Sequence, residues 1–276
     1  MNLTLGFSPC PNDTFIFHAL VEGIVPLPGV QFTERLEDVE TLNRLAQAGT
    51  LDVTKVSYGA VPYLLDEYTL LRSGGALGRG CGPLLVTRGE KSVADLEGGR
   101  IAIPGRMTTA NLLLRLFGPS LPEGEEMLYS EIMPAVERGE VDAGLIIHES
   151  RFTYPEHGLT CLVDLGEWWE QETGSPIPLG GIMARRSLGE ELIGRIDAAI
   201  RRSVEHAFAH PADSDGYVRR HAQEMDPEVM RRHIDLYVNS FSVELGEEGE
   251  QAVRELLGRA IAPGTRSPGE PLPSAP

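Results

Sequence analysis

The sequence predicts a two-lobed α/β fold, and three features of the chain lead to this prediction. Short apolar segments alternate with amphipathic ones through the first half, as in strand–helix–strand units. A glycine-dense stretch at 74–82 interrupts the alternation and predicts a connector between lobes. From residue 188 onward the pattern is mainly helical. A chain of 276 residues is long enough for two lobes with hydrophobic cores.

The segments before the glycine stretch predict a largely parallel sheet, because strands separated by helices of this length pair in parallel. Asn12 or Asp13 is the expected N-cap of the first helix, and Gly49 ends the second helix. The expected elements are, in order, a strand at 3–7, a helix to about residue 22, a strand at 30–36, a helix at 38–48 and a strand at 51–57.

The segments that flank and follow the glycine stretch predict a second alternating block and then a set of helices. The expected strands are at 70–72, 83–87, 100–104, 127–129, 143–147 and 180–185. The expected helices are at 92–96, 109–117, 131–138, 188–209, 213–223, 226–238 and 247–260.

This order of elements predicts how the chain is divided into lobes. The chain crosses between them near 83–88 and near 180–186, so the first lobe is discontinuous. The predicted division is a larger lobe of residues 1–85 plus 186–276, a smaller lobe of residues 86–185 and a loose tail at 263–276. In such folds ligands bind between the lobes, at the carboxyl ends of strands.

The composition excludes several classes of partner. The formal net charge is −17, which disfavours nucleic acid and anionic membrane surfaces. No run of about 18 apolar residues occurs, and the N-terminus lacks a basic and apolar leader, so we expect a cytoplasmic protein. We expect no protein partner. The expected ligand is a small anion that local donors bind against the overall charge.

The cysteines give no sign of a disulfide framework or a zinc site. The chain has three cysteines, Cys10, Cys81 and Cys161, which is an odd number. They are far apart in the sequence and form no Cys-x-x-Cys motif. Cys10, between two prolines, is either a nucleophile or a small buried thiol, and the buried thiol is the commoner case. No Gly-x-Ser-x-Gly motif and no metal-ligand spacing occurs.

Four loops follow predicted strands and carry polar side chains, as ligand sites require. They are Ser8–Thr14, Thr54–Tyr58, Pro104–Ala110 and His148–Arg151. The third loop opens a helix at Thr109 and Ala110, where unpaired N–H groups and the helix dipole favour an anion. N-capping by Thr108 or Thr109 explains the same residues, and the two roles are compatible.

Lys55 and His148 are the two side chains best placed for chemistry. Lys55 lies in an apolar strand, where a charge must find a ligand or a partner. The sequence leaves two alternatives open: a substrate carboxylate or a structural ion pair with an acidic neighbour. His148 directly follows a buried strand, and its ordinary pKa near 6.5 suits a general base, although a purely structural histidine is the alternative.

Four blocks of the chain resemble one known family. They are Gly6–Phe17, Glu37–Asn43, Arg72–Gly80 and Gly144–Tyr154. In these blocks the chain is similar to the 1,4-dihydroxy-6-naphthoate synthase family of the futalosine route to menaquinone. The resemblance covers nearly the whole chain up to about residue 250, and the four blocks are highly specific in combination.

The resemblance implies a type II periplasmic-binding-protein-like fold with a central cleft. It implies a carbon–carbon lyase that converts cyclic dehypoxanthine futalosine to 1,4-dihydroxy-6-naphthoate and releases dihydroxyacetone, with no metal or organic cofactor. It makes His148 the catalytic base. The residues that it places in contact with substrate are Lys55, Val56, Ser57, Thr109, Ala110 and Asn43. Val56 stands where the family has leucine.

Two other functions remain open at this point. A solute-binding protein for small carboxylates would use the same fold and need no base. Chorismate dehydratase, a sister enzyme of the pathway, has a similar fold, but the block Ser8–Asp13 argues against it.

Overall fold

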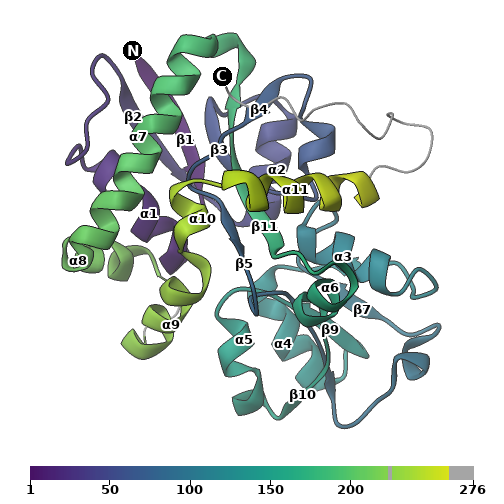
Figure 1. Cartoon of the computed structure of the whole chain (residues 1–276). Coiled ribbons are helices and arrows are strands. Elements are labelled where there is room, and N and C mark those ends of the chain that lie inside the picture. The colour runs from purple at the N-terminus through teal and green to yellow at the C-terminus, as the bar shows by residue number, and fades with distance from the viewer. Residues whose placement is uncertain (223–225, 261–276) are drawn as a thin grey trace. The chain divides into compact units, whose positions relative to one another are not determined.

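The computed structural model describes residues 1–222 and 226–260, and these form two compact units (Figure 1). The first unit comprises residues 1–78 and those from 178 onward, and the second comprises residues 79–177. The first unit is therefore built from both ends of the chain. The loose tail predicted at 263–276 lies outside the described residues.

The first unit contains a mixed sheet with the strand order β2-β1-β3-β11-β4, and β5 pairs with β11. β1 is parallel to β2 and β3, as the alternating pattern predicts. β11 is antiparallel to β3 and β4, so the prediction of a largely parallel sheet is wrong on that side. The strands are β1 (Asn2–Phe7), β2 (Gln31–Leu36), β3 (Val53–Ser57), β4 (Tyr68–Leu70), β5 (Ala76–Gly78) and β11 (Ile177–Arg185).

β11 also sets the boundary between the units. Its residues Gly180–Ala184 pair with β3, the central strand of the first sheet. The backbone hydrogen bonds of this ladder place the strand in the first unit. The chain therefore crosses between units at 78/79 and 177/178, whereas the sequence pattern placed the boundaries at 85/86 and 185/186.

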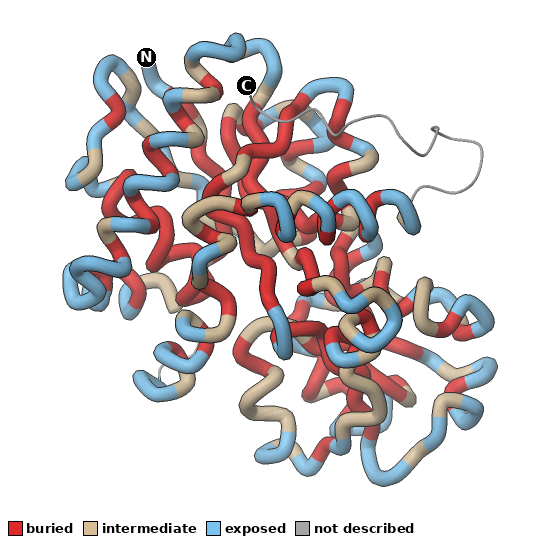
Figure 2. The backbone as a smooth tube through the Cα atoms, in the orientation of Figure 1, coloured by how far each residue is buried: buried red, intermediate tan, exposed pale blue. Residues whose placement is uncertain are grey.

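Helices of the first unit share one hydrophobic core with β1. α1 packs against α7, α8 and α9, and Leu3, Leu5 and Phe7 of β1 lie in the same buried cluster. Figure 2 colours the backbone by burial and shows much of this unit as buried. None of the described helices is both long and apolar enough to cross a bilayer. The helices are α1 (Pro11–Val21), α2 (Val39–Gln47), α7 (Glu190–Ala209), α8 (Pro211–His221), α9 (Pro227–Tyr237), α10 (Ser240–Val243) and α11 (Gly246–Ala260), with short 3₁₀ turns η1 (Val61–Tyr63) and η4 (Arg186–Leu188).

The second unit is a smaller mixed sheet, in the order β10-β6-β9-β7-β8. α4 packs on β9, and their apolar side chains form a separate core. The elements are β6 (Leu84–Arg88), η2 (Val93–Leu96), β7 (Ile101–Ile103), α3 (Thr109–Phe117), β8 (Glu125–Glu126), α4 (Tyr129–Arg138), β9 (Ala143–Ile146), α5 (Ser150–Thr153), η3 (Tyr154–His157), β10 (Leu159–Asp164) and α6 (Leu165–Thr173).

Three of these elements, β8, β10 and α6, differ from the sequence-based prediction. The strand expected at 127–129 is β8, two residues earlier, because Tyr129 begins α4 instead. β10 and α6 were not predicted. Their residues are only partly buried over long stretches, so they lack the clear apolar period that a strand or helix shows in sequence.

A close backbone approach joins the segment just before β6 to the start of α6 in the second unit. A Cβ atom on Gly166 would lie 2.7 Å from both the backbone N and the Cα of Gly82. Backbone atoms cannot move aside as a flexible side chain can, so only glycine fits here. Gly194, inside α7, is also a helical glycine, but a Cβ there would meet no atom within 4 Å.

These two helical glycines make a matched pair for a stability test. We expect Gly166→Ala to lower the free energy of unfolding by about 1–3 kcal/mol, because overpacking strains the contact. Gly194→Ala should raise it by about 0.5–1 kcal/mol through helix propensity. Thermal unfolding followed by circular dichroism measures both. Equal melting temperatures for the two variants would contradict the close approach.

Candidate functional site

In the first unit, the predicted site residues lie at the carboxyl end of β3. β1 and β3 are parallel neighbours, with Leu5 opposite Val53, so the loops that follow them leave the same edge of the sheet. One loop begins at Ser8 and the other at Tyr58. The sequence predicted that these loops carry ligand-binding groups, and the sheet brings them together.

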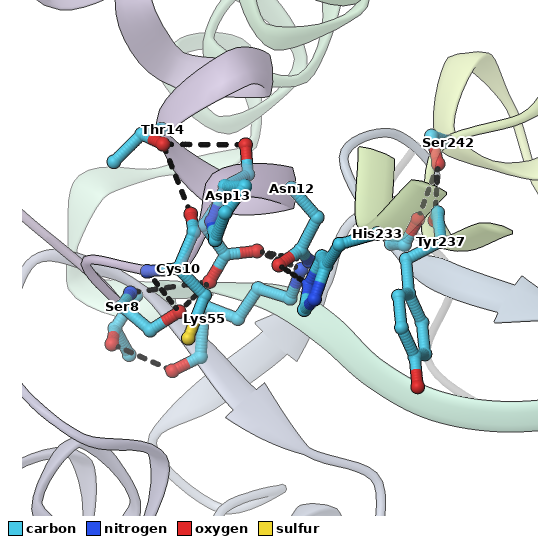
Figure 3. Close-up of polar contacts among 12 residues, drawn as sticks. Ser8, Cys10, Asn12, Asp13, Thr14, Lys55, His233, Tyr237 and Ser242 are labelled. Carbon is cyan, nitrogen blue, oxygen red and sulfur yellow. Dashed lines mark hydrogen bonds and ion pairs between the residues drawn. The ribbon is translucent and has the colours of Figure 1, made fainter. Parts of the chain in front are cut away.

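The Lys55 ammonium forms a buried ion pair with Asp13 (Figure 3). This is the structural alternative that the sequence left open. The same Asp13 carboxylate accepts from the Ser8 hydroxyl at 2.7 Å, the Ser8 backbone N–H at 3.1 Å and Asn12 Nδ2 at 2.9 Å. Both oxygens of the carboxylate are therefore used, as a buried charge requires.

This arrangement corrects the predicted helix cap. Cys10 is the N-cap of α1, and Pro11 occupies the first turn, where its missing N–H costs nothing. Neither Asn12 nor Asp13 caps the helix, because the Asp13 carboxylate faces Ser8 and Lys55 instead. The first-turn N–H groups of Asp13 and Thr14 bond to the Cys10 carbonyl, each at 3.1 Å.

Asn43 fixes the backbone at the end of β3. Its side chain is fully buried on α2, and its Oδ1 accepts from the Ser57 N–H at 2.9 Å. Its Nδ2 donates to Glu40 at 3.2 Å, so both ends of the amide are used. Asn43 therefore positions the backbone of Ser57. The family resemblance named both residues as substrate contacts, and nothing else in the sequence linked them.

Val56 has its side chain fully buried and lies opposite Gly181 in β11. Successive side chains of a strand point to opposite faces, so Lys55 and Ser57 share one face and Val56 lies on the other. The side chain of Val56 therefore belongs to the core.

In the second unit, Thr108 caps α3, and Thr109 and Ala110 begin it. The Thr108 hydroxyl accepts from the Asn111 N–H at 3.2 Å and donates to the Gly105 carbonyl at 2.7 Å. Of the two predicted caps, Thr108 is the one observed. The side chains of Thr109 and Ala110 are buried at the helix start, where N–H groups lack intrahelical acceptors.

His148 directly follows β9 and has an unusual backbone. Its φ is 58°, and it is the one non-glycine residue with positive φ among the described residues. This left-handed conformation costs a residue with a Cβ atom about 1–2 kcal/mol. The half-buried imidazole lies 5.4 Å from the ring of Tyr129, between ring centroids. Strain of this kind is concentrated at functional positions.

The second sheet brings the α3 start and His148 to one edge. β7 and β9 are parallel neighbours, with Ile101 opposite Ala143. The loop after β7 leads to Thr109, and the residues after β9 lead to His148. The two loops therefore leave the same edge, so an anion-binding helix start and an imidazole occur together there.

The thiols offer little chemistry in the described structure. Burial raises the pKa of Cys81 to about 12 and also raises the pKa of Cys161. Neither thiol forms a reactive thiolate at neutral pH. Cys10 is buried and free of disulfide bonds, which fits the commoner of its two readings. Within either unit taken alone, no three described His, Cys or carboxylate groups lie close enough to hold a metal ion.

Sequence reasoning missed the polar residues that surround Lys55. His233 lies in a segment predicted only as a helix, at 226–238, yet it is fully buried and its Nε2 lies 2.9 Å from Asn12 Oδ1. Ser8 was predicted only as part of a polar loop, and Asp13 only as part of that loop and as a candidate helix cap. A lysine in an otherwise apolar strand was the available signal, since its partner had to be an acid nearby.

Known proteins resemble this chain over nearly its whole length. A family model described as menaquinone biosynthesis matches residues 3–262. A 1,4-dihydroxy-6-naphtoate synthase of Thermus thermophilus is 57% identical over 96% of this chain and 96% of the relative. A relative of the same name from Streptomyces coelicolor is 52% identical, over 95% of this chain and 94% of the relative.

Solved structures agree on the fold. A protein of Archaeoglobus fulgidus matches with a TM-score of 0.88 at 37% identity, over 94% of this chain and 96% of that one. A Candida albicans gene product described as having the generic periplasmic binding protein fold matches with a TM-score of 0.70 at 11% identity, over 95% and 91% of the two chains. The predicted two-lobed, periplasmic-binding-protein-like α/β fold is confirmed.

The backbone of His148 can be tested through stability. We expect His148→Gly to unfold with a free energy about 1 kcal/mol higher than His148→Ala, because glycine adopts positive φ without strain. At His206, inside α7, the order should reverse, because glycine disfavours a helix. Thermal unfolding measures all four variants. If Ala and Gly rank in the same order at both positions, the strain at His148 is disproved.

Proposed function

The chain belongs to the menaquinone biosynthesis family, and from that premise we propose that it is a carbon–carbon lyase. It converts cyclic dehypoxanthine futalosine to 1,4-dihydroxy-6-naphthoate and releases dihydroxyacetone. The observation that carries the proposal is the strained His148 at the same sheet edge as the start of α3. The reaction needs no metal or organic cofactor and no macromolecular partner.

His148 is the proposed catalytic base. The base removes an acidic proton next to a carbonyl, the carbon–carbon bond to the sugar fragment breaks, and the ring becomes aromatic. The departing fragment takes the electron pair of that bond and a proton and leaves as dihydroxyacetone. One imidazole suffices for this proton transfer at neutral pH. The left-handed backbone supports the role, because strained conformations of this kind are concentrated at functional positions.

The substrate carboxylate binds at the start of α3, at Thr109 and Ala110. The positive end of the helix and its N–H groups favour an anion there. Lys55 is a weaker candidate for the carboxylate because Asp13 already neutralises it. A second anion beside Asp13 would add a buried negative charge that no cation balances.

The residues at the end of β3 bind neutral oxygen atoms of the substrate. An ammonium has three N–H donors, and within residues 1–222 and 226–260 that of Lys55 contacts one acceptor, Asp13. Ser57 lies on the same face of the strand as Lys55. Asn43 and Val56 contribute by fixing the backbone of β3. Asn43 accepts a hydrogen bond from the Ser57 N–H, and Val56 pairs with Gly181 of β11.

General-base catalysis accounts for roughly 10²–10⁴-fold of the rate. The rest has to come from holding the substrate in the reactive geometry. Formation of an aromatic ring makes the overall reaction favourable. The proposed function therefore requires a base and fixed donors. His148 is the proposed base, and the hydrogen bond from the Ser57 N–H to Asn43 supports a fixed backbone at the end of β3.

The experiment is a turnover assay with the cyclic substrate, with products identified by mass spectrometry. We expect His148→Asn to lower kcat by roughly 10²–10⁴-fold while calorimetry shows substrate binding unchanged within a few-fold. His157→Asn, an exposed histidine of the same unit, is the control and should keep full activity.

Three results would contradict the proposal. Wild-type protein that binds the substrate but forms no product would favour a solute-binding protein. Dehydration of chorismate would favour the sister enzyme. Full activity of His148→Asn would be consistent with the proposed reaction but would show that His148 is not its catalytic base.

A further inference from the structure

His233 joins the C-terminal part of the first unit to the loop that follows β1. It lies on α9, is fully buried, and its Nε2 is 2.9 Å from Asn12 Oδ1, across 221 positions of sequence (Figure 3). Its ring also lies 4.7 Å from that of Tyr237, one turn along the same helix. No part of the proposed reaction mechanism uses this histidine.

The direction of the hydrogen bond follows from the next contact. Asn12 Nδ2 donates to Asp13 Oδ1 at 2.9 Å, so Asn12 Oδ1 faces His233 and must accept. The proton of the imidazole is therefore on Nε2. The opposite orientation of the amide would set Asn12 Oδ1 against the Asp13 carboxylate, which is repulsive. His233 thus selects the orientation of the Asn12 amide.

The orientation of the Asn12 amide affects the position of Asp13 Oδ1, the carboxylate oxygen to which Lys55 is bound. Asp13 Oδ1 accepts from Asn12 and from Lys55, while Oδ2 accepts twice from Ser8. Losing the Asn12 donor would leave Oδ1 with Lys55 alone and allow the carboxylate to turn. A buried ion pair without its supporting hydrogen bonds is poorly defined in position.

We propose that His233 is a positioning residue for Lys55. It acts through Asn12 and Asp13 and fixes where the ammonium points at the carboxyl end of β3. Its effect on turnover rests on the proposed function, in which Lys55 binds substrate. Its effect on the Lys55 ammonium does not, because that effect is a property of the free protein.

The composition of the chain supplies a direct readout. Lys55 and Lys91 are its only lysines. Protein labelled with ¹⁵N-lysine therefore gives two Nζ signals, which Lys91→Arg assigns. Lys91 lies in the second unit beside Asp142 and serves as an internal reference in every spectrum.

Three variants separate positioning from simple packing. His233→Leu removes the donor, and His233→Gln restores an N–H near the position of Nε2. Met230→Leu changes a buried side chain of the same helix without touching the network. If His233→Leu does not fold, His233→Asn takes its place, because its amide is too short to reach Asn12.

We expect His233→Leu to shift or broaden the Lys55 signal and to lower kcat/KM about 10-fold or more, as loss of a buried hydrogen-bond partner does. His233→Gln should recover most of both, and Met230→Leu should change neither. The Lys91 signal should stay in place throughout. The spectra need no substrate, so absence of turnover in wild type would overturn the proposed function and leave this test intact.

Two outcomes would overturn the inference. One is an unchanged Lys55 signal in folded His233→Leu or His233→Asn. The other is an equal shift in Met230→Leu, which would mean that any repacking of α9 disturbs the ammonium.

Discussion

The buried ion pair between Lys55 and Asp13 is the constraint on which the first unit's candidate site depends. A charged pair removed from water is stable only when its remaining donors and acceptors are satisfied. Asp13 meets this requirement with Ser8 and Asn12, and Asn12 in turn requires His233. Lys55 in the central strand is therefore linked through Asp13 to the loop after β1 and the start of α1, and through Asn12 to His233 on α9.

The same topological rule operates in both units. Parallel neighbouring strands end at the same edge, so the loops that follow them are brought together whatever their separation in sequence. In the first unit this gathers the loop after β1 and the end of β3, and in the second it gathers the start of α3 and His148. The two edges differ in chemistry: one holds a neutralised cation, and the other holds a helix N-terminus and an imidazole.

Much of this could be predicted from the sequence, since local patterns decide it. The helix at Thr109–Phe117 and the strands of the first block follow from apolar periodicity. What could not be predicted depends on distant contacts. The placement of β11 follows from its pairing with β3. The N-cap of α1 is Cys10 because the Asp13 carboxylate pairs with Lys55 and not with the helix N-terminus. The role of His233 depends on its contact with Asn12, 221 positions away in the sequence. The φ of His148 has no signature in sequence either, because no glycine marks the position.

The central claim is that side chains of this protein alone break the carbon–carbon bond, with an imidazole as the base. The most direct measurement is the product stoichiometry of purified protein given cyclic dehypoxanthine futalosine in buffer with a metal chelator. We expect one dihydroxyacetone for each 1,4-dihydroxy-6-naphthoate, at the rate seen without chelator. Turnover that stops in chelator and returns with added metal, or naphthoate formed without dihydroxyacetone, would contradict it.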